Sequence, residues 1–251
     1  MWSEADYKNK IICGNCNELI KNLPDKSIDL IYTDVPYDYG SSGKSHKENE
    51  SGLSKRKSNN YNDLSDMDIT LGFDYSILDE FCRVEKKILI YIWCSKAQIK
   101  PLMDYYVDKK GCQYNIFCWT KTNPIPAINN SFLSDIEYLL MFFEPGACAF
   151  YSDDVHDRCK WYNSSINVKD KDKFEHPTIK PAVFVERQIR CSCPEGGIVL
   201  DPFMGSGTTG VACKNNNRNY VGFEISPKYA EIANNRLHGE LANGQLTMFV
   251  M

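Results

Sequence analysis

An acid, a proline and a tyrosine follow an apolar run near the start of the chain, in the segment IDLIYTDVPYDYG that begins at Ile28. The carboxylate of Asp34 can accept hydrogen bonds, and the ring of Tyr37 can stack on a flat ligand. Val35 precedes Pro36, and a residue before proline favours an extended backbone conformation. The segment predicts a strand that delivers a polar site at its carboxyl end. The alternative interpretation is an ordinary strand that ends in a Pro-Tyr turn.

A second group of residues, DPFMGSGTTG, follows another apolar run and contains G-x-G-x-x-G. Gly205 and Gly207 allow the backbone to turn tightly and to approach a ligand closely. A helix that starts at Thr208 or Thr209 would point its positive end at that ligand. Glu224 ends the next predicted strand, where a carboxylate can accept both hydroxyls of a ribose. The pattern predicts a nucleotide-bearing ligand and fits a nicotinamide-dependent oxidoreductase as well as a methyltransferase.

A third segment, HPTIKP over residues 176–181, separates these two alternatives. Thr178 can cap the helix that follows, and Lys180 supplies a positive charge. A cofactor with a carboxylate tail would use that charge, whereas a dinucleotide would need a phosphate site instead. The structural alternative is a helix start between prolines with an exposed lysine.

The elements that must position these residues alternate between strands and helices. Apolar runs predict strands over 9–13, 28–34, 86–94, 113–120, 135–143, 197–201 and 219–224. Helical spacing is found over 69–84, 96–111, 181–192, 208–216 and 226–241, with a short helix after Asn17 that ends near Pro24. Continuous apolar strands between helices predict an α/β fold with a mostly parallel sheet covered on both faces. Ligands of such sheets lie at the carboxyl ends of the strands, where the strand order reverses.

Composition predicts a single domain over residues 1–251. The chain is 43% hydrophobic and has a formal net charge of −4, so a uniformly basic surface is excluded and contacts with nucleic acid must come from local patches. An odd number of cysteines, 11, indicates reduced thiols and a cytoplasmic location. Cys13 and Cys16 form a C-x-x-C pair, but a zinc site needs four converging ligands, so we expect no metal. No apolar run approaches the roughly 20 residues that span a bilayer, so no membrane association is expected.

Taken together, DVPY, HPTIKP and DPFMGSGTT occur in an order that resembles the beta-type (permuted) DNA amino-methyltransferases, which act on adenine N6 or cytosine N4. The resemblance covers nearly the whole chain, including the closing segment NYVGFEISPKYAEIANNRL. It implies a Rossmann-like methyltransferase fold, S-adenosylmethionine as cofactor and double-stranded DNA as partner. Restriction-modification is the biological setting that it implies.

The resemblance also assigns roles to individual residues. It implies that Glu224 holds the ribose hydroxyls, that Thr178 and Lys180 face the methionine end, and that the remaining cofactor contacts come from Asp201, Phe203, Gly205, Gly207 and Thr208. Asn15 is a departure, because the family often has an aspartate there on the adenine side of the cofactor. An asparagine can still accept a hydrogen bond and can also donate one.

The catalytic segment implied by the resemblance is Asp34, Val35, Pro36 and Tyr37. The lone pair of an exocyclic amino group is delocalised into the base, and two acceptors that take its hydrogens favour a more pyramidal nitrogen. Asp34 offers one acceptor and the carbonyl of Val35 offers the second, while Tyr37 can stack on a flipped base. Valine keeps that carbonyl and loses only the fixed φ of a proline. In the family that the chain resembles, an aspartate at this position goes more often with adenine, so the resemblance implies adenine as the target. Cytosine N4 and an inactive, methyltransferase-like DNA-binding protein are the alternatives.

Contacts with DNA are expected from two polar segments. A mobile, DNA-facing loop over 38–66 follows the catalytic residues, and a short target-recognition segment is expected over 144–175. The basic residues that we expect to touch phosphates are Lys44, Lys55, Arg56, Lys57, Arg158 and Lys160. The short second segment predicts a short recognition site or a homodimer. Near the end of the chain, Gln245–Phe249 (QLTMF) resembles peptides that dock on a bacterial sliding clamp, with an apolar edge strand as the alternative.

Overall fold

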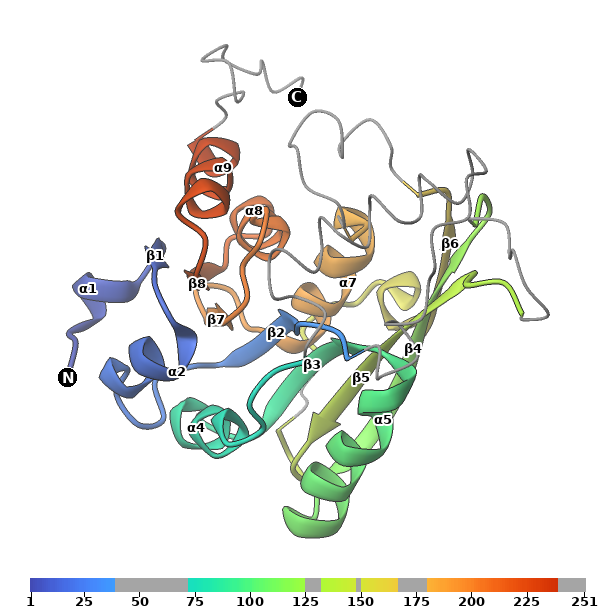
Figure 1. Cartoon of the computed structure of the whole chain (residues 1–251), viewed down its shortest axis with the longest axis horizontal. Helices are drawn as coiled ribbons and strands as arrows, with labels where there is room; N and C mark the ends of the chain where they lie inside the picture. The colour runs from blue at the N-terminus through green and yellow to red at the C-terminus, as the bar shows by residue number, and fades with distance from the viewer. Residues whose placement is uncertain (39–71, 125–131, 148–149, 167–179, 239–251) are drawn as a thin grey trace, which may run out of the picture.

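The computed structural model describes residues 1–38, 72–124, 132–147, 150–166 and 180–238. These residues form one eight-stranded sheet in the order β1-β8-β7-β2-β3-β5-β4-β6 (Figure 1). The strands are β1 (Lys10–Cys13), β2 (Leu30–Asp34), β3 (Leu89–Cys94), β4 (Gln113–Lys121), β5 (Ile136–Phe143), β6 (Trp161–Ser164), β7 (Ile198–Asp201) and β8 (Asn219–Glu224).

The sheet is mostly parallel, as its sequence pattern predicts. Neighbouring strands from β1 through β8, β7 and β2 to β3 are parallel, and β5 alone among the described strands runs antiparallel to both of its neighbours. β6 pairs in parallel with β4 at the edge. The predicted α/β fold class is therefore confirmed, with one reversed strand in the sheet.

Helices cover both faces of this sheet. In Figure 1, α7 and α8 lie on one face with α9 beside α8, while α4 and α5 lie on the other. The helical segments are α1 (Glu4–Tyr7), α2 (Cys16–Leu19), η1 (Ile20–Asn22), α4 (Ile77–Val84), α5 (Lys96–Met103), the π-helix η3 (Asp104–Lys109), η4 (Val155–Arg158), α7 (Ala182–Ser192), α8 (Thr208–Asn215) and α9 (Pro227–His238). No helix among the described residues is long and apolar enough to cross a membrane.

Alternating side chains of each central strand enter two separate cores. On β2, Leu30 and Tyr32 pack in the cluster that contains Phe184 of α7. Ile31, between them, packs in the other cluster, with Phe81 of α4. A strand buried on both faces explains why the central strands read as continuous apolar runs in the sequence.

The strand order reverses between β2 and β7. The chain passes from β2 to its neighbour β3 on one side, and from β7 to its neighbour β8 on the other. β2 and β7 pair directly, with Ile31 opposite Leu200. Their carboxyl ends, Asp34 and Asp201, therefore lie at the point where this class of sheet binds its ligands.

Two expectations about the elements are wrong. The helix predicted over 69–84 begins only at Ile77, because Gly72 has φ +75° and the carboxylate of Asp74 accepts the backbone N–H of Ser76 in a turn. The polar segment over 144–175, for which no strand or helix is predicted above, contains η4 and β6, and β6 pairs with β4 through Trp119 and Tyr162. A four-residue strand with polar members carries too little alternation to be found in the sequence.

Candidate active site

Asp34 ends β2 and lines a cavity in the described structure. Its Oδ2 accepts a hydrogen bond from Lys180 Nζ at 2.9 Å. Its Oδ1 is buried and has no hydrogen-bond partner among the described residues. An unpartnered buried acceptor is costly, and such groups are retained where a ligand or substrate satisfies them.

Val35 turns its side chain into the core, where it is 2% exposed and packs with Ile77 of α4. Residue 35, which lacks the fixed φ of a proline, is thus held in place by the packing of its side chain. The next residue is held by a hydrogen bond: Gln98 Nε2, in the first turn of α5, donates to the carbonyl of Pro36 at 2.8 Å. Gln98 is itself fixed, because its Oε1 accepts the backbone N–H of Ser95.

Lys180 is the centre of a buried ion network. Its Nζ lies 2.9 Å from Asp34 Oδ2, 2.8 Å from Glu137 Oε2 and 3.0 Å from the hydroxyl oxygen of Tyr37. Glu137 stands on β5 and also pairs with Lys121 at 2.6 Å. The alternative of an exposed lysine is wrong, since the Lys180 side chain is 7% exposed. Its charge is directed at two carboxylates, and the expected contact with the cofactor's methionine end stays a prediction.

Burial and charge change the ionisation of this network in opposite directions. Desolvation raises the pKa of Asp34; Lys180 opposes this shift and Glu137 adds to it. For Glu137 desolvation also acts upward, but Lys180 and Lys121 outweigh it and lower the pKa to about 2. Desolvation alone would lower the pKa of Lys180, and the carboxylates of Asp34 and Glu137 outweigh it and raise that pKa. Lys180 and Glu137 are therefore both charged at neutral pH.

The glycine segment after β7 is held by the acid that ends β8. Glu224 Oε2 accepts the backbone N–H of Gly205 at 2.8 Å, and its Oε1 accepts that of Ser226 at 2.9 Å. Gly205 has φ +51° and Gly207 has φ +82°, so the loop uses the left-handed region at both positions. Gly207 caps α8, and a Cβ built on it would lie 3.0 Å from Cβ of Ala233 in α9. This glycine allows two helices to approach closely.

Asp201 organises the start of the same loop from inside. Its Oδ2 accepts the hydroxyl of Thr209 at 2.6 Å, and its Oδ1 accepts the backbone N–H of Phe203 at 3.1 Å. Burial raises the pKa of Asp201 to about 7, although both hydrogen bonds oppose the shift. The carboxylate therefore shapes the loop that it begins.

A cavity of about 370 Å³ joins these two groups of residues. Asp34 and Tyr37 line it at the carboxyl end of β2, and Glu224 and Asn15 line it at the carboxyl ends of β8 and β1. The predicted residues that line it are Asn15, Asp34, Val35, Pro36, Tyr37, Lys180, Asp201, Phe203, Gly205, Thr208 and Glu224. Asn15 also caps α2, because its Oδ1 accepts the backbone N–H of Asn17. Thr178 lies outside the described residues.

Comparison with known proteins identifies the family of this chain. The profile of the N6/N4 methyltransferase family, described as DNA methylase, matches residues 28–235. The chain belongs to the N6/N4 DNA methylase family. It is 31% identical to the type II methyltransferase M.HpaI of Haemophilus parainfluenzae over 249 residues, covering 92% of this chain and 74% of that protein. Family membership confirms the resemblance drawn from DVPY, HPTIKP and DPFMGSGTT.

Solved structures agree with the assignment to this methylase family. The crystal structure of the M1.HpyAVI–SAM complex has a TM-score of 0.64 and 26% identity, covering 91% of this chain and 99% of that one. The cytosine-N4-specific PvuII DNA methyltransferase has a TM-score of 0.63 at 17% identity, covering 96% of this chain and 95% of that one. The second likeness shows the shared fold.

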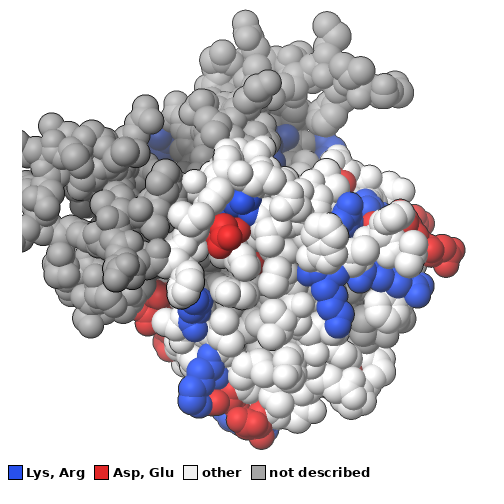
Figure 2. Space-filling model, turned by 90° about the vertical axis from the view of Figure 1, so that its right-hand side faces the viewer, with Lys and Arg blue, Asp and Glu red and all other residues white. Residues whose placement is uncertain are grey.

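Most residues expected to touch DNA lie outside the described structure. These are Lys44, Lys55, Arg56 and Lys57, and the clamp-like segment Gln245–Phe249 also lies outside. Arg158 and Lys160 are described: the Arg158 guanidinium lies over the ring of Phe150, and Lys160 Nζ bonds to Asn115. On the face shown in Figure 2, basic side chains form separate groups beside acidic ones, and uncharged atoms cover most of the described surface. That both residues touch phosphates stays a prediction.

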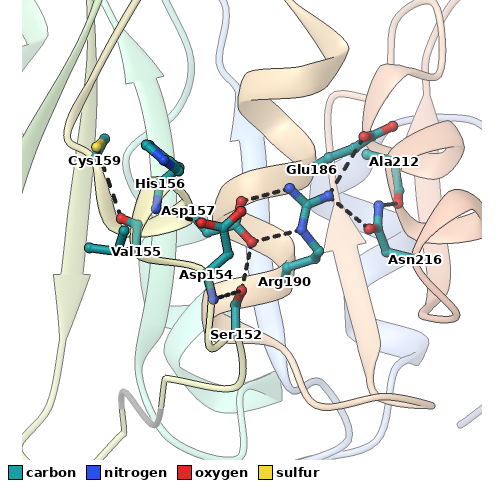
Figure 3. A network of polar contacts seen from close by, with 10 residues as sticks. All are labelled: Ser152, Asp154, Val155, His156, Asp157, Cys159, Glu186, Arg190, Ala212 and Asn216. Carbon is teal, nitrogen blue, oxygen red and sulfur yellow. Dashed lines mark hydrogen bonds and ion pairs between the residues drawn. The ribbon is translucent and has the colours of Figure 1, made fainter.

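Within the expected target-recognition segment, the residues around η4 are fixed to α7. Asp157 of η4 is buried and accepts two hydrogen bonds from Arg190 of α7, at 2.7 and 2.8 Å (Figure 3). Ser152 donates to the same carboxylate, and Arg190 also donates to Asn216 after α8. The segment around η4 is therefore part of the packed structure, held by a charged network.

Sequence reasoning missed two residues of the site, Glu137 and Gln98. Glu137 lies opposite Trp119 in the register of β4 and β5 and reaches the site through Lys180. A lone acid near the start of an otherwise apolar strand is the only signal that it leaves in the sequence. Gln98 is fully buried in the first turn of α5, and a glutamine in a helix gives no comparable signal.

Proposed function

We propose that this chain transfers a methyl group from S-adenosylmethionine to the exocyclic amino nitrogen of an adenine that is flipped out of double-stranded DNA. The observation that carries the proposal is the buried, unpartnered Oδ1 of Asp34 in the cavity that the glycine loop also lines. Membership in the N6/N4 DNA methylase family supports the reaction class. The aspartate at position 34 supports adenine.

The residues around the cavity fit S-adenosylmethionine. A volume of about 370 Å³ lies in the usual range for small-molecule sites, about 300–1,000 Å³. Each oxygen of Glu224 accepts one backbone N–H, and a carboxylate has about four lone-pair positions, so two ribose hydroxyls can still be accepted. Phe203 and Ile225 provide apolar wall beside it. The relative M1.HpyAVI has been crystallised as a complex with the same cofactor.

The chain's own residues then prepare the amino group. S-adenosylmethionine supplies a methyl group that is already activated on a sulfonium. Asp34 Oδ1 accepts one amino hydrogen and the carbonyl of Val35 accepts the other, which localises the nitrogen lone pair toward the methyl group. The neighbouring carbonyl of Pro36 is already bound by Gln98, which favours Val35 for this role. The raised pKa of Asp34 suits Oδ1 to take the proton that the nitrogen releases.

The DNA partner and its setting follow from the relatives and remain part of the proposal. M.HpaI is a type II methyltransferase, so we place this chain in a restriction-modification setting. The basic residues of the 38–66 segment contact DNA phosphates, and the segment over 144–175 reads the target sequence. A homodimer would extend that short reading surface, and docking on a sliding clamp through Gln245–Phe249 would bring the enzyme to newly made DNA.

The test uses labelled S-adenosylmethionine, unmethylated DNA of varied sequence and the purified chain, followed by digestion to nucleosides. We expect label in N6-methyladenine, and we expect Asp34→Ala to lower the rate at least about 100-fold, the usual cost of removing a transition-state hydrogen bond. Asp29→Asn is the matched control, because Asp29 pairs with Lys86 at the opposite end of β2 and is 14% exposed. Its rate should equal that of the wild type.

Two other outcomes would change the assignment. Label in N4-methylcytosine would keep the mechanism and overturn the choice of base. Absence of label on DNA, with S-adenosylmethionine still bound by calorimetry, would identify an inactive DNA-binding protein or a different acceptor.

A further inference from the structure

We propose that Glu137 is a positioning residue for methyl transfer, which acts through Lys180 to decide which oxygen of Asp34 faces the amino group. The inference rests on the proposed function and extends it to a residue of β5, outside the three sequence motifs. Glu137 touches neither the target base nor the cofactor in this role. Glu137 holds the Lys180 ammonium in place, and that ammonium in turn orients the Asp34 carboxylate.

The first step is the saturation of Lys180. An ammonium has three N–H donors, and the structure supplies three acceptors: Asp34 Oδ2 at 2.9 Å, Glu137 Oε2 at 2.8 Å and the Tyr37 hydroxyl at 3.0 Å. The same ammonium also lies 5.1 Å from the ring centroid of Trp93. Because every donor is used, Lys180 can hold only one oxygen of Asp34, and Oδ1 is left for the substrate.

The second step is that Glu137 is fixed independently of the catalytic segment. Its Oε1 pairs with Lys121 on β4 at 2.6 Å, and Lys121 lies 5.2 Å over the ring of Trp119. Trp119 stands directly opposite Glu137 in the antiparallel register. The carboxylate is therefore anchored to the β4–β5 pair, and it presents its second oxygen to Lys180 from a fixed direction.

The third step is the balance of charge. Asp34 and Glu137 carry two negative charges, and Lys180 and Lys121 carry two positive ones. If Glu137 is neutral, Asp34 becomes the only carboxylate paired with Lys180. The ammonium then moves closer to Asp34 and competes for Oδ1, because a buried charge needs all the compensation within reach. The substrate loses the acceptor that the wild-type network keeps open.

Removing the charge of Glu137 also has a defined effect on the titration of Asp34. The groups that face Asp34 are Lys180, Glu137, Tyr37, Tyr32, Cys94 and Asp201. Glu137 raises the pKa of Asp34 by repulsion and Lys180 lowers it. Neutral glutamine at 137 removes the repulsion and keeps the lysine, so the pKa of Asp34 falls.

The experiment compares Glu137→Gln with the wild type and with Asp29→Asn, whose carboxylate is buried to a similar degree, 14% exposed against 19%. Three quantities are measured: kcat and KM for DNA, the Kd for S-adenosylmethionine, and the carboxyl carbon-13 NMR titration of Asp34. In Glu137→Gln we expect kcat to fall about 10- to 100-fold, the range that follows a misplaced reacting group. The KM and Kd should stay within about twofold, and the Asp34 midpoint should move to lower pH.

Each outcome decides the inference. An unchanged kcat or an unchanged Asp34 midpoint in Glu137→Gln overturns it, as does an equal loss of kcat in Asp29→Asn. If Glu137→Gln does not fold, Lys121→Gln loosens Glu137 from its far side and should give a smaller loss of kcat in the same direction; an unchanged kcat there overturns the inference. If the wild type methylates no DNA, the proposed function fails, and the Asp34 titration still decides whether Glu137 controls that carboxylate.

Discussion

The carboxylates of this chain differ mainly in what surrounds them. Glu137 has two lysine partners and a pKa of about 2, whereas burial raises the pKa of Asp201 to about 7. Glu85 is the extreme case outside the site. It is fully buried, its Oε1 accepts the backbone N–H of Leu89, and its Oε2 has no hydrogen-bond partner among the described residues. Burial raises its pKa to about 8.

Glu85 therefore makes the stability of the fold depend on pH. Its pKa in the folded state lies above the ordinary value of 4.5, so between about pH 4.5 and 8 the folded chain keeps a proton that the unfolded chain has lost. The stabilising effect of that proton is complete below pH 4.5 and disappears as the pH rises through 8. We expect Glu85→Gln to raise the free energy of unfolding by roughly 1–3 kcal/mol above pH 8.

Urea denaturation at pH 5.5 and at pH 8.5 measures this difference. The control is Glu195→Gln, because the Glu195 side chain is 76% exposed and should change little at either pH. A gain from Glu85→Gln that is the same at both pH values would contradict the assignment.

At the scale of the elements, the site depends on how closely α8 and α9 pack. Gly207 has φ +82°, and a Cβ there would lie 3.0 Å from Cβ of Ala233. Gly111 has a similar φ of +71°, with no atom within 4 Å of a Cβ built on it. We expect Gly111→Ala to cost about 1 kcal/mol from backbone strain, and Gly207→Ala to cost about 2–4 kcal/mol because overpacking is added.

The midpoints of urea denaturation of Gly111→Ala and Gly207→Ala, each compared with the wild type, measure this difference in stability. Equal losses in the two variants would mean that α9 moves away from α8 without cost. A loss of stability confined to Gly207→Ala would mean that the stability depends on the close contact with Ala233 and not on the left-handed backbone conformation.

Sequence patterns predict the strands well, because buried parallel strands are continuous apolar runs. They also predict the site where the strand order reverses, because an acidic residue ends each of three strands. Asp34, Asp201 and Glu224 stand where the pattern expects them, at the ends of β2, β7 and β8. The partners of Lys180 could not be predicted in this way. Glu137 approaches it through the antiparallel pairing of β5 with β3 and β4, a long-range register that no local spacing encodes.

At the scale of the whole molecule, elements from the N-terminal and the C-terminal parts of the described chain line the same cavity. Asn15 follows β1, Asp34 ends β2, and Glu224 ends β8, and all three line the same space. A ligand that fills this cavity contacts elements whose packing is lost together on unfolding. Binding should therefore stabilise the entire fold, and not only the loop after β7.

Thermal unfolding with and without cofactor tests this expectation. At 100 times its Kd, S-adenosylmethionine should add about 2.7 kcal/mol and raise the Tm by about 5–10 °C. The same concentration of NAD should leave the Tm unchanged. A shift with NAD and none with S-adenosylmethionine would favour the oxidoreductase alternative suggested by G-x-G-x-x-G.

The pairing of β2 with β7 has a consequence for how a gene of this kind can change. Asp34 and Asp201 stand far apart in the sequence, yet they end two neighbouring, hydrogen-bonded strands and line one cavity. The chemistry depends on that neighbourhood and is indifferent to which strand the ribosome makes first. A gene rearrangement that moves the block encoding the β7–α8–β8 unit ahead of β2 would leave both acids at the same edge of the same sheet. The order of the motifs along the chain therefore records ancestry, while their place in the sheet determines the reaction.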